Sequence, residues 1–328
     1  MSTTIREAAN ASTEVFAKAD PAAKLPMQRL FNESGIQMGP FVTMAEERRM
    51  LGSRNWKHFR AKQLGVTVGA ELSGIDLTAE LPDAAIAEIR EALHAYKVIF
   101  FRDQPLTPES HVAFGSRFGE LEVHPFLPGS QARPELVRFE KGADAGGYEN
   151  SWHHDVTWRA IPSMGAILHA VQVPELGGDT LFADMCAAYD GLSDEVKEQI
   201  DSLSAVHDFM KSFGRTVPAD RMEETRAKYP LVEHPVVCTH TGTGRKYLYV
   251  NRIFVDHIVG LEPEESRQLL EHLCYQATYP EYQCRFHWTN DAVAFWDNRA
   301  VQHYAASDYY PEIRIMERAS VVGDRPVR

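Results

Sequence analysis

The sequence predicts a mostly β fold with surrounding helices, and three observations carry that prediction. Short apolar and β-branched runs dominate the chain after residue 130. Helical periodicity is confined to a few segments. The 328 residues are 44% hydrophobic and 24% charged, which is typical of a globular protein with a sizeable core. Many short strands with few helices favour a β-sandwich or barrel with helices packed outside it.

The first 55 residues differ from the rest of the chain. They are rich in alanine and carry Pro21, Pro26 and Pro40, with no sustained strand pattern. We interpret 1–55 as a poorly defined N-terminal extension and 56–328 as the main domain.

The first half of the main domain is predicted to hold two helices and two strands. Apolar residues recur every three to four positions over 83–96, which predicts a helix. Thr107 followed by Pro108 fits an N-cap and a first helical residue, so a second helix begins there. Strands are expected at 64–72, as a strand with a bend, and at 98–101.

Short strands dominate the second half. They are expected at 136–139, 164–172, 179–183, 232–239, 246–250, 283–288, 291–296 and 312–322. Helices are expected at 193–203 and 262–276. The polar stretch 208–231 contains two prolines and is a candidate lid over a site. The glycine-rich stretch 141–150 is a second candidate mobile segment.

Composition excludes several classes of function. The net charge of −12 and the pI near 5.6 argue against a nucleic-acid partner or an anionic membrane surface, although they permit a small anionic substrate. No apolar run reaches the ~20 residues of a membrane span. The four cysteines include no CxxC pair, which indicates no zinc site and a reduced, cytoplasmic protein. Assembly into a homo-oligomer stays open.

The segment Trp152-His153-His154-Asp155 is the central functional signal. On a strand, alternate side chains share a face, so His153 and Asp155 would point together and His154 away. His303 is the best candidate for a third ligand. Two histidines and one carboxylate form the facial triad of non-haem iron(II) oxygenases, which leaves coordination positions for a keto acid and O₂. The alternative is a chance HxD among 14 histidines.

A second signal lies near the C-terminus, where Arg314 and Arg318 fall on one face of a predicted strand. Two arginines directed into a barrel are costly unless each meets an anion, and the guanidinium fork suits carboxylates and sulfonates. Thr180 follows the turn formed by Gly177 and Gly178, and its hydroxyl could help Arg314 hold a carboxylate. The alternatives are a surface strand with solvated arginines and an ordinary hairpin.

In their order along the chain these motifs resemble the taurine dioxygenase (TauD/TfdA) family, which includes phenoxyacetate-herbicide dioxygenases and alkylsulfatase dioxygenases. The likeness runs from about residue 58 to the end and includes Trp296-Asp297-Asn298-Arg299-Ala300-Val301-Gln302-His303. The resemblance implies a double-stranded β-helix, or jelly-roll, that uses Fe(II), 2-oxoglutarate and O₂. It implies that iron is held by His153, Asp155 and His303, and 2-oxoglutarate by Thr180 and Arg314. The substrate would meet His124, Val156, Phe213, Phe254 and Arg318.

The chain departs from that family at three positions. His154 replaces a threonine between two metal ligands, and Leu127 and Glu149 replace a tyrosine and an asparagine around the taurine amine. We therefore expect an apolar-tailed sulfonate, sulfate ester or carboxylate in place of taurine. Two other functions stay open: hydroxylation or desaturation of a larger natural-product acid, and a non-catalytic metal-binding β-barrel.

Overall fold

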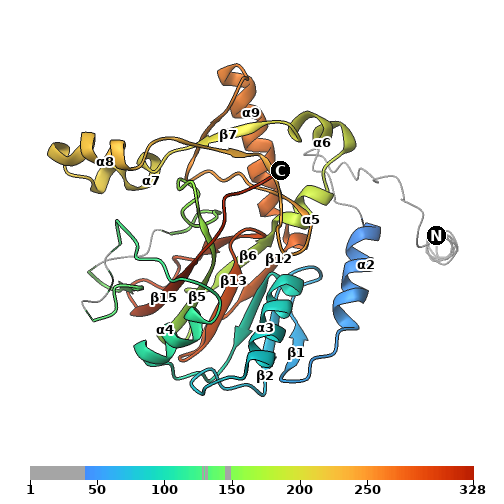
Figure 1. Ribbon diagram of the computed structural model, residues 1–328, viewed down its shortest axis with the longest axis vertical. Coiled ribbons are helices and arrows are strands. Elements are labelled where there is room, and N and C mark those ends of the chain that lie inside the picture. The colour runs from blue at the N-terminus through green and yellow to red at the C-terminus, as the bar shows by residue number, and fades with distance from the viewer. Residues whose placement is uncertain (1–40, 128, 130–131, 145–148) are drawn as a thin grey trace, which may run out of the picture.

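The computed structural model describes residues 41–127, 129, 132–144 and 149–328. A seven-stranded sheet forms the largest layer (Figure 1). Its strand order is β1 (Arg60–Gln63), β2 (Ala70–Ser73), β3 (Val98–Phe101), β13 (Val293–Asp297), β5 (Ser163–Gln172), β15 (Arg314–Val322) and β4 (Leu136–Lys141). All neighbours pair antiparallel except β2 and β3, which are parallel.

Helices α3 (Asp83–Tyr96) and α4 (Pro108–Ser116) cover one face of this sheet. Ile89 of α3 and Phe114 of α4 are buried against side chains of β3, β13 and β5. A capping box joins Thr107 to Ser110 and starts α4, because each side chain accepts a hydrogen bond from the other's backbone N–H.

A three-stranded sheet packs on the opposite face of the large sheet. Its order is β12 (Gln283–Phe286), β6 (Thr180–Asp184) and β14 (Val301–Ala305). Phe182 and Phe286 of this sheet meet Phe100 and Trp296 of the large one, and the rings of Phe100 and Phe286 stack with centroids 4.0 Å apart. Met316 of β15 lies in the same cluster. Side chains on that face of β15 therefore point between the two sheets.

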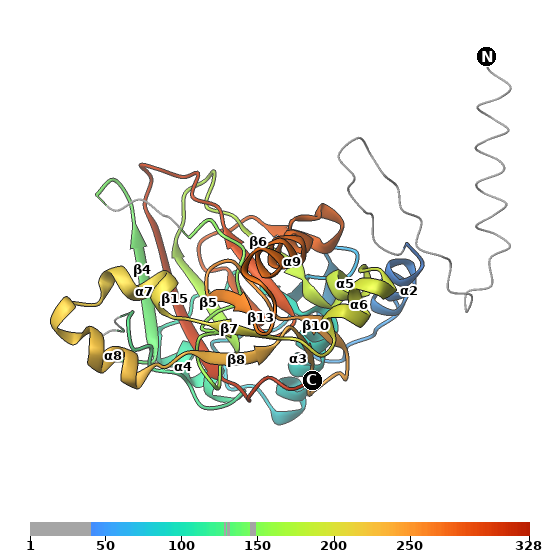
Figure 2. The same cartoon turned by 90° about the horizontal axis from the view of Figure 1, so that it is seen from above.

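Smaller elements complete the described fold. One sheet pairs β11 (Val255–Ile258), β7 (Ser204–His207) and β8 (Val232–Pro235), and another pairs β10 (Lys246–Leu248) with β9 (Val237–Thr239). The remaining helices are α5 (Met185–Asp190), α6 (Asp194–Ile200), α7 (Met210–Phe213), α8 (Met222–Lys228) and α9 (Pro263–Tyr275). In both views α7 and α8 lie at one edge of the molecule, far from helix α2 (Phe41–Gly52) (Figures 1 and 2). In the described residues, no helix has both the length and the apolar character that crossing a membrane requires.

Helix α2 is tied to the domain by buried charges. The Glu47 carboxylate accepts a hydrogen bond from Lys97 Nζ at 2.5 Å, and Asp184 lies 3.0 Å from the same ammonium. Arg245 also bonds Glu47. Burial by itself lowers the pKa of Lys97, but the two carboxylates reverse this and raise it. Removal of Glu47 would leave a buried cation with less compensation.

The observed elements confirm the predicted helix over 83–96, the strand at 98–101 and the helix that Thr107 caps. The predicted strand with a bend over 64–72 is confirmed only in part, because 65–68 form the bend and only 70–72 of this range lie in a strand. Strand β1 ends at Gln63 and β2 begins at Ala70, and the chain between them bends through Gly69, whose φ of +86° breaks an extended strand.

In the second half, the predicted strand over 232–239 divides into β8 and β9, which belong to different sheets. The candidate lid 208–231 contains two short helices, α7 and α8. Residues 145–148 of the glycine-rich stretch lie outside the described residues. The fold is thus a mixed α/β arrangement of several sheets, with more helix than predicted.

Candidate metal centre and co-substrate site

His153 and His303 meet as an isolated antiparallel β-bridge, in which His303 is the middle residue of β14. Each backbone N–H donates to the other's carbonyl, at 3.1 and 2.9 Å, and the ring centroids lie 4.2 Å apart. His153 Nδ1 lies 2.8 Å from the Ser151 carbonyl oxygen, which accepts its proton. In the neutral ring, that hydrogen bond places the proton on Nδ1 and leaves Nε2 of His153 able to bind a metal.

Asp155 follows two residues later but does not lie on a strand, because the chain turns over 155–158. The prediction that a regular strand brings His153 and Asp155 together is therefore wrong in its cause, although the two side chains do meet. Asp155 Oδ1 is 3.8 Å from His153 Nε2. Arg318 Nη1 donates to both carboxylate oxygens, at 3.0 and 2.9 Å.

These side chains have the charge states that a metal ligand needs. Burial favours the neutral acid at Asp155, but the surrounding positive charges, that of Arg318 first among them, together outweigh burial and hold the pKa of this carboxyl below its ordinary value. Burial, with the neighbouring His153, lowers the pKa of His303 well below its ordinary value. Asp155 is therefore an anion and His303 a neutral imidazole at pH 7. One donor atom from each of His153, Asp155 and His303 lies within 4.8 Å of the others, so the N,N,O set fits a single divalent cation.

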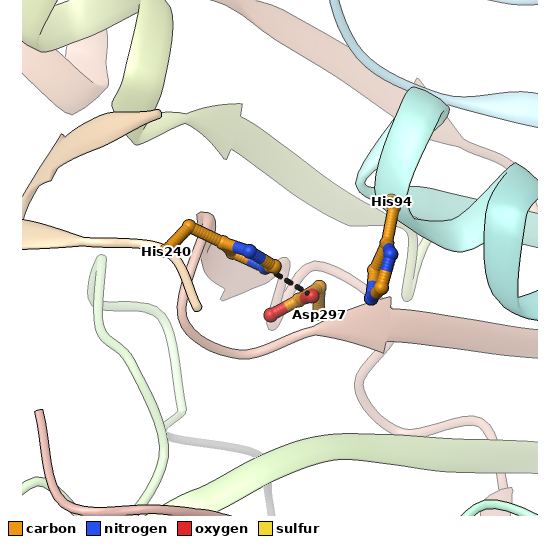
Figure 3. A group of neighbouring side chains, drawn as sticks. All are labelled: His94, His240 and Asp297. Carbon is orange, nitrogen blue, oxygen red and sulfur yellow. Dashed lines mark hydrogen bonds and ion pairs between the residues drawn. The ribbon is translucent and has the colours of Figure 1, made fainter. Parts of the chain in front are cut away.

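A second cluster, His94, His240 and Asp297, has similar spacing but different chemistry (Figure 3). His240 Nδ1 accepts from the backbone N–H groups of Gly242 and Thr243, so Nε2 carries the proton that it donates to Asp297 at 2.8 Å. The Asp297 carboxylate is also bound by the guanidinium of Arg299. Among the described residues, these hydrogen bonds take up the lone pairs of His240 and Asp297 that a metal would need, so the cluster is structural.

A third cluster joins His111 of α4, His169 of β5 and Glu317 of β15. It lies on the helix-covered face of the large sheet, because Glu317 alternates with Arg318 along β15. Glu317 already accepts a hydrogen bond from Arg138 at 2.8 Å. This cluster therefore lies on the opposite face of β15 from Arg314 and Arg318.

Arg314 and Arg318 both point between the two main sheets, as the alternation along β15 predicts. Arg314 is 8% exposed, and its Nε donates to the Gly178 carbonyl at 3.1 Å. Among residues 41–127, 129, 132–144 and 149–328, no carboxylate lies within 4.0 Å of its guanidinium. Burial lowers the pKa of Arg314. Within the described part of the chain, Arg314 is therefore a buried cation with unused donors.

Thr180 and Arg314 both contact the indole ring of Trp288. Thr180 is buried at the start of β6, and its Oγ1 accepts from Trp288 Nε1 at 2.9 Å. Because the indole N–H occupies one lone pair, the hydroxyl proton of Thr180 stays available to donate. A side chain at Gly178 would meet Arg314 Cδ at 3.0 Å, and Gly178 has φ +70°, so glycine is required for this close approach.

An apolar cluster adjoins Asp155. Val156 and Phe254 are buried in one cluster, and Phe213 packs against it. The ring of His124 lies 5.6 Å from that of Phe213. The structure thus brings together the four apolar or aromatic residues that the sequence assigned to a substrate.

His124 is a neutral donor and not a cation. Its Nδ1 accepts from the backbone N–H of Phe126 and of Leu127, at 3.2 and 3.0 Å, which places the ring proton on Nε2. Burial and, next, the charge of Arg318 lower the pKa of His124 to about 3. Arg318 is therefore the cation beside this apolar cluster.

The three departures from the family pattern have distinct surroundings. Leu127 is half-buried next to His124. Glu149 forms an ion pair with Lys141 at 3.3 Å, on the side of the site where Arg314 lies. His154 is fully buried against the ring of Tyr249, and burial lowers the pKa of His154 to about 3. Its side chain faces the core and not the metal triad.

The sequence analysis assigned no role to three residues that shape the site: Ser151, Trp288 and Asn298. Ser151 orients His153, Trp288 orients the Thr180 hydroxyl, and Asn298 bonds the backbone of Asp155. Asn298 stands inside the motif that ends at His303, so its position in that motif was the available signal. The other two act through contacts that have no local signature.

The fold and these clusters define a mixed α/β protein with a buried two-histidine, one-carboxylate group, the donor set of the non-haem iron oxygenases. Residues 60–320 match the model of the taurine catabolism dioxygenase TauD, TfdA family. The chain is 36% identical over 268 residues to an alpha-ketoglutarate-dependent sulfate ester dioxygenase of Pseudomonas putida, covering 79% of this chain and 88% of that protein.

The solved structures that resemble this one include the following two. A taurine dioxygenase from Burkholderia xenovorans has a TM-score of 0.72 and 38% identity, covering 83% of this chain and 91% of that chain. AAD-2, in complex with Mn(II) and N-oxalylglycine, has a TM-score of 0.70 and 31% identity, covering 82% and 99%. The chain belongs to the TauD/TfdA family of alpha-ketoglutarate-dependent dioxygenases.

Proposed function

We propose that this dioxygenase uses Fe(II), 2-oxoglutarate and O₂ to hydroxylate a small anionic substrate that carries an apolar tail. The observation that carries the proposal is the convergence of three groups: the N,N,O donor set, the buried Arg314, which has no carboxylate partner among the described residues, and Arg318 beside an apolar cluster. We further propose that the two packed sheets form a double-stranded β-helix, and that the catalytic domain spans 56–328.

In this proposal His153, Asp155 and His303 hold the iron. Ser151 fixes the tautomer of His153, and Arg318 keeps Asp155 ionised. Iron with bound keto acid and O₂ would supply the oxidising chemistry, and the protein would orient the substrate and exclude water from it.

Arg314 and Thr180 would bind the distal carboxylate of 2-oxoglutarate. The fork of Arg314 offers two parallel N–H donors, and the Thr180 hydroxyl adds a third. The N-oxalylglycine in the AAD-2 structure supports this role, because that compound is a dicarboxylate with the shape of 2-oxoglutarate. A buried guanidinium without a carboxylate partner is the group that such a ligand would neutralise.

The substrate's acidic group would lie between Arg318 and the Nε2–H of His124. Arg318 Nη1 is engaged by Asp155, while its Nε is buried without a partner in the described part of the chain. Val156, Phe213 and Phe254 would contact the tail. The named activity of the Pseudomonas putida relative supports a sulfate ester as one such substrate.

The pocket predicts that an alkyl sulfate or alkyl sulfonate is turned over better than taurine. A substrate ammonium next to this apolar cluster would face Leu127 and other apolar side chains, and its burial there without a carboxylate partner is costly. Glu149 pairs with Lys141 and so is not committed to a substrate ammonium. The experiment is succinate release with iron(II), ascorbate and a panel of sulfate esters, sulfonates, carboxylates and taurine.

Two results would count against this proposal. Absence of succinate release with every acid, under conditions where the iron is bound, would refute the activity. A kcat/KM for taurine that exceeds that of an alkyl acid of similar length by roughly tenfold, about 1.4 kcal/mol, would refute the reading of the substrate pocket.

A further inference from the structure

Asn298 occupies the turn between β13 and β14, and its side chain is 1% exposed. Its Oδ1 accepts a hydrogen bond from the backbone N–H of Asp155 at 2.7 Å. Its Nδ2 donates to the carbonyl oxygens of Asp155 at 3.0 Å and of Ser163 at 3.1 Å. One carboxamide therefore satisfies both backbone polar groups of a residue 143 positions away.

Asp155 needs such a partner because strand pairing stops before it. His153 forms the last backbone bridge to His303, and the chain then turns. A buried backbone N–H or C=O without a hydrogen-bond partner destabilises the fold, and without Asn298 both of these groups of Asp155 would lose the partner they have here. The carboxamide is a side chain that donates and accepts in one plane, as a neighbouring strand does.

The next residue, Val156, has φ +48°. A β-branched side chain is a genuine outlier in this left-handed region, so the backbone here is strained. Strain of this kind persists only where surrounding contacts over-determine the conformation. The hydrogen bonds from Asn298 hold the backbone of Asp155, the residue that directly precedes the strained Val156.

The turn that carries Asn298 is itself firmly held. Asp297 is bound by the guanidinium of Arg299, with Nε–Oδ1 2.8 Å and Nη2–Oδ2 2.6 Å, and by His240 (Figure 3). The Asp297 N–H donates to the Lys97 carbonyl at 2.8 Å, and the Asn298 N–H to the Met164 carbonyl at 2.9 Å. The carboxamide is thus presented from a rigid base.

We propose that Asn298 is a positioning residue for the metal site: it acts as a substitute strand for Asp155 and holds the strained backbone that aims this carboxylate at His153 and His303. The inference rests on the proposed function, since it gives Asp155 the role of a metal ligand. Loss of Asn298 lets Val156 relax toward negative φ, and the Asp155 carboxylate then leaves its place.

The test measures Mn²⁺ affinity, by the electron paramagnetic resonance signal of free Mn²⁺, together with thermal unfolding of the metal-free protein. Asn298→Asp keeps the shape but replaces the donor by a carboxylate oxygen, and Asn298→Ala removes both bonds. We expect each to weaken Mn²⁺ binding about 10- to 100-fold, the usual effect of losing an outer partner of a metal ligand. Asn290→Ala is the matched control, because that exposed asparagine also bonds a backbone N–H, of Val173, far from the triad.

A second substitution separates positioning from general support. Glycine adopts positive φ readily, so Val156→Gly removes the strain that Asn298 opposes. We expect Val156→Gly to recover most of the Mn²⁺ affinity lost in Asn298→Ala, while the unfolding temperature stays low. A merely structural role would not produce this recovery.

Several outcomes would overturn the inference. They are wild-type Mn²⁺ affinity in Asn298→Asp, no recovery with Val156→Gly, and failure of both Asn298 variants to fold, which would assign the residue to the fold as a whole. A wild-type protein that binds no Mn²⁺, or a His303→Ala variant that binds it normally, would instead refute the proposed metal site.

Discussion

Replacing Arg314 with alanine should raise the KM for 2-oxoglutarate by one to two decades. The guanidinium is 8% exposed, spends only Nε on the Gly178 carbonyl, and has no carboxylate within 4.0 Å among the described residues. In the part of the chain that the structure describes, its Nη groups have no acceptor and are therefore left for a ligand. Loss of hydrogen bonds to a charged group costs about 1.5–3 kcal/mol, and each 1.4 kcal/mol corresponds to about tenfold in affinity.

Two further variants sharpen this test. Arg314→Lys keeps the charge but loses the planar fork, so its KM should lie between those of the wild type and the alanine variant. Gly178→Ala should also raise the KM, because the new Cβ would lie 3.0 Å from Arg314 Cδ at a residue with φ +70°. Arg138→Ala is the control, since that arginine is exposed and pairs with Glu317. Succinate formation at varied 2-oxoglutarate gives the constants, and an unchanged KM in Arg314→Ala would refute the assigned role.

Three other predictions follow from the site and its surroundings. Alanine in place of any one member of the metal triad should abolish iron-dependent succinate formation, whereas His257→Ala, at an exposed position, should not; full activity in a triad variant would contradict the assignment. Burial holds the pKa of His124 at about 3, so the ring is already neutral above that pH. The wild type and His124→Gln should therefore have pH profiles of kcat/KM with the same shape between about pH 5 and 8. An inflection in this range that the wild type shows and His124→Gln lacks would disprove the neutral state of His124. Glu47→Ala should lower the free energy of unfolding by about 3–5 kcal/mol, because it removes one partner of the buried Lys97. Denaturant unfolding measures this, with Glu46→Ala, at an exposed neighbouring position, as the control. Equal free energies of unfolding for the two variants would contradict the prediction.

The domain boundary near residue 56 remains a proposal. Every residue assigned to the metal and the co-substrate lies beyond residue 120, so removal of 1–55 should leave the triad in place. The same deletion removes α2 with Glu47 and Leu51, which is 1% exposed. We expect the truncated protein to be less stable and still able to bind the metal.

Local rules were sufficient wherever the deciding contacts lie within one element. Periodicity located α3, because its buried residues recur along a single helix face. Alternation placed Arg314 and Arg318 on the same face of β15. The strand β14 was not predicted, since Val301–Ala305 mixes apolar and polar residues without alternation and owes its conformation to pairing with β6.

The sequence by itself determined the donor types: the HxD pair, the distant His303, and the arginines and threonine that suit an anionic co-substrate. Only the tertiary structure decided how they are held. The His153–His303 bridge, the Arg318–Asp155 ion pair and the Asn298–Asp155 hydrogen bonds all join residues more than 140 positions apart. Such contacts leave no periodic trace in the chain, because they depend on how two sheets pack and where the turns between them fall, and not on the neighbours of each residue.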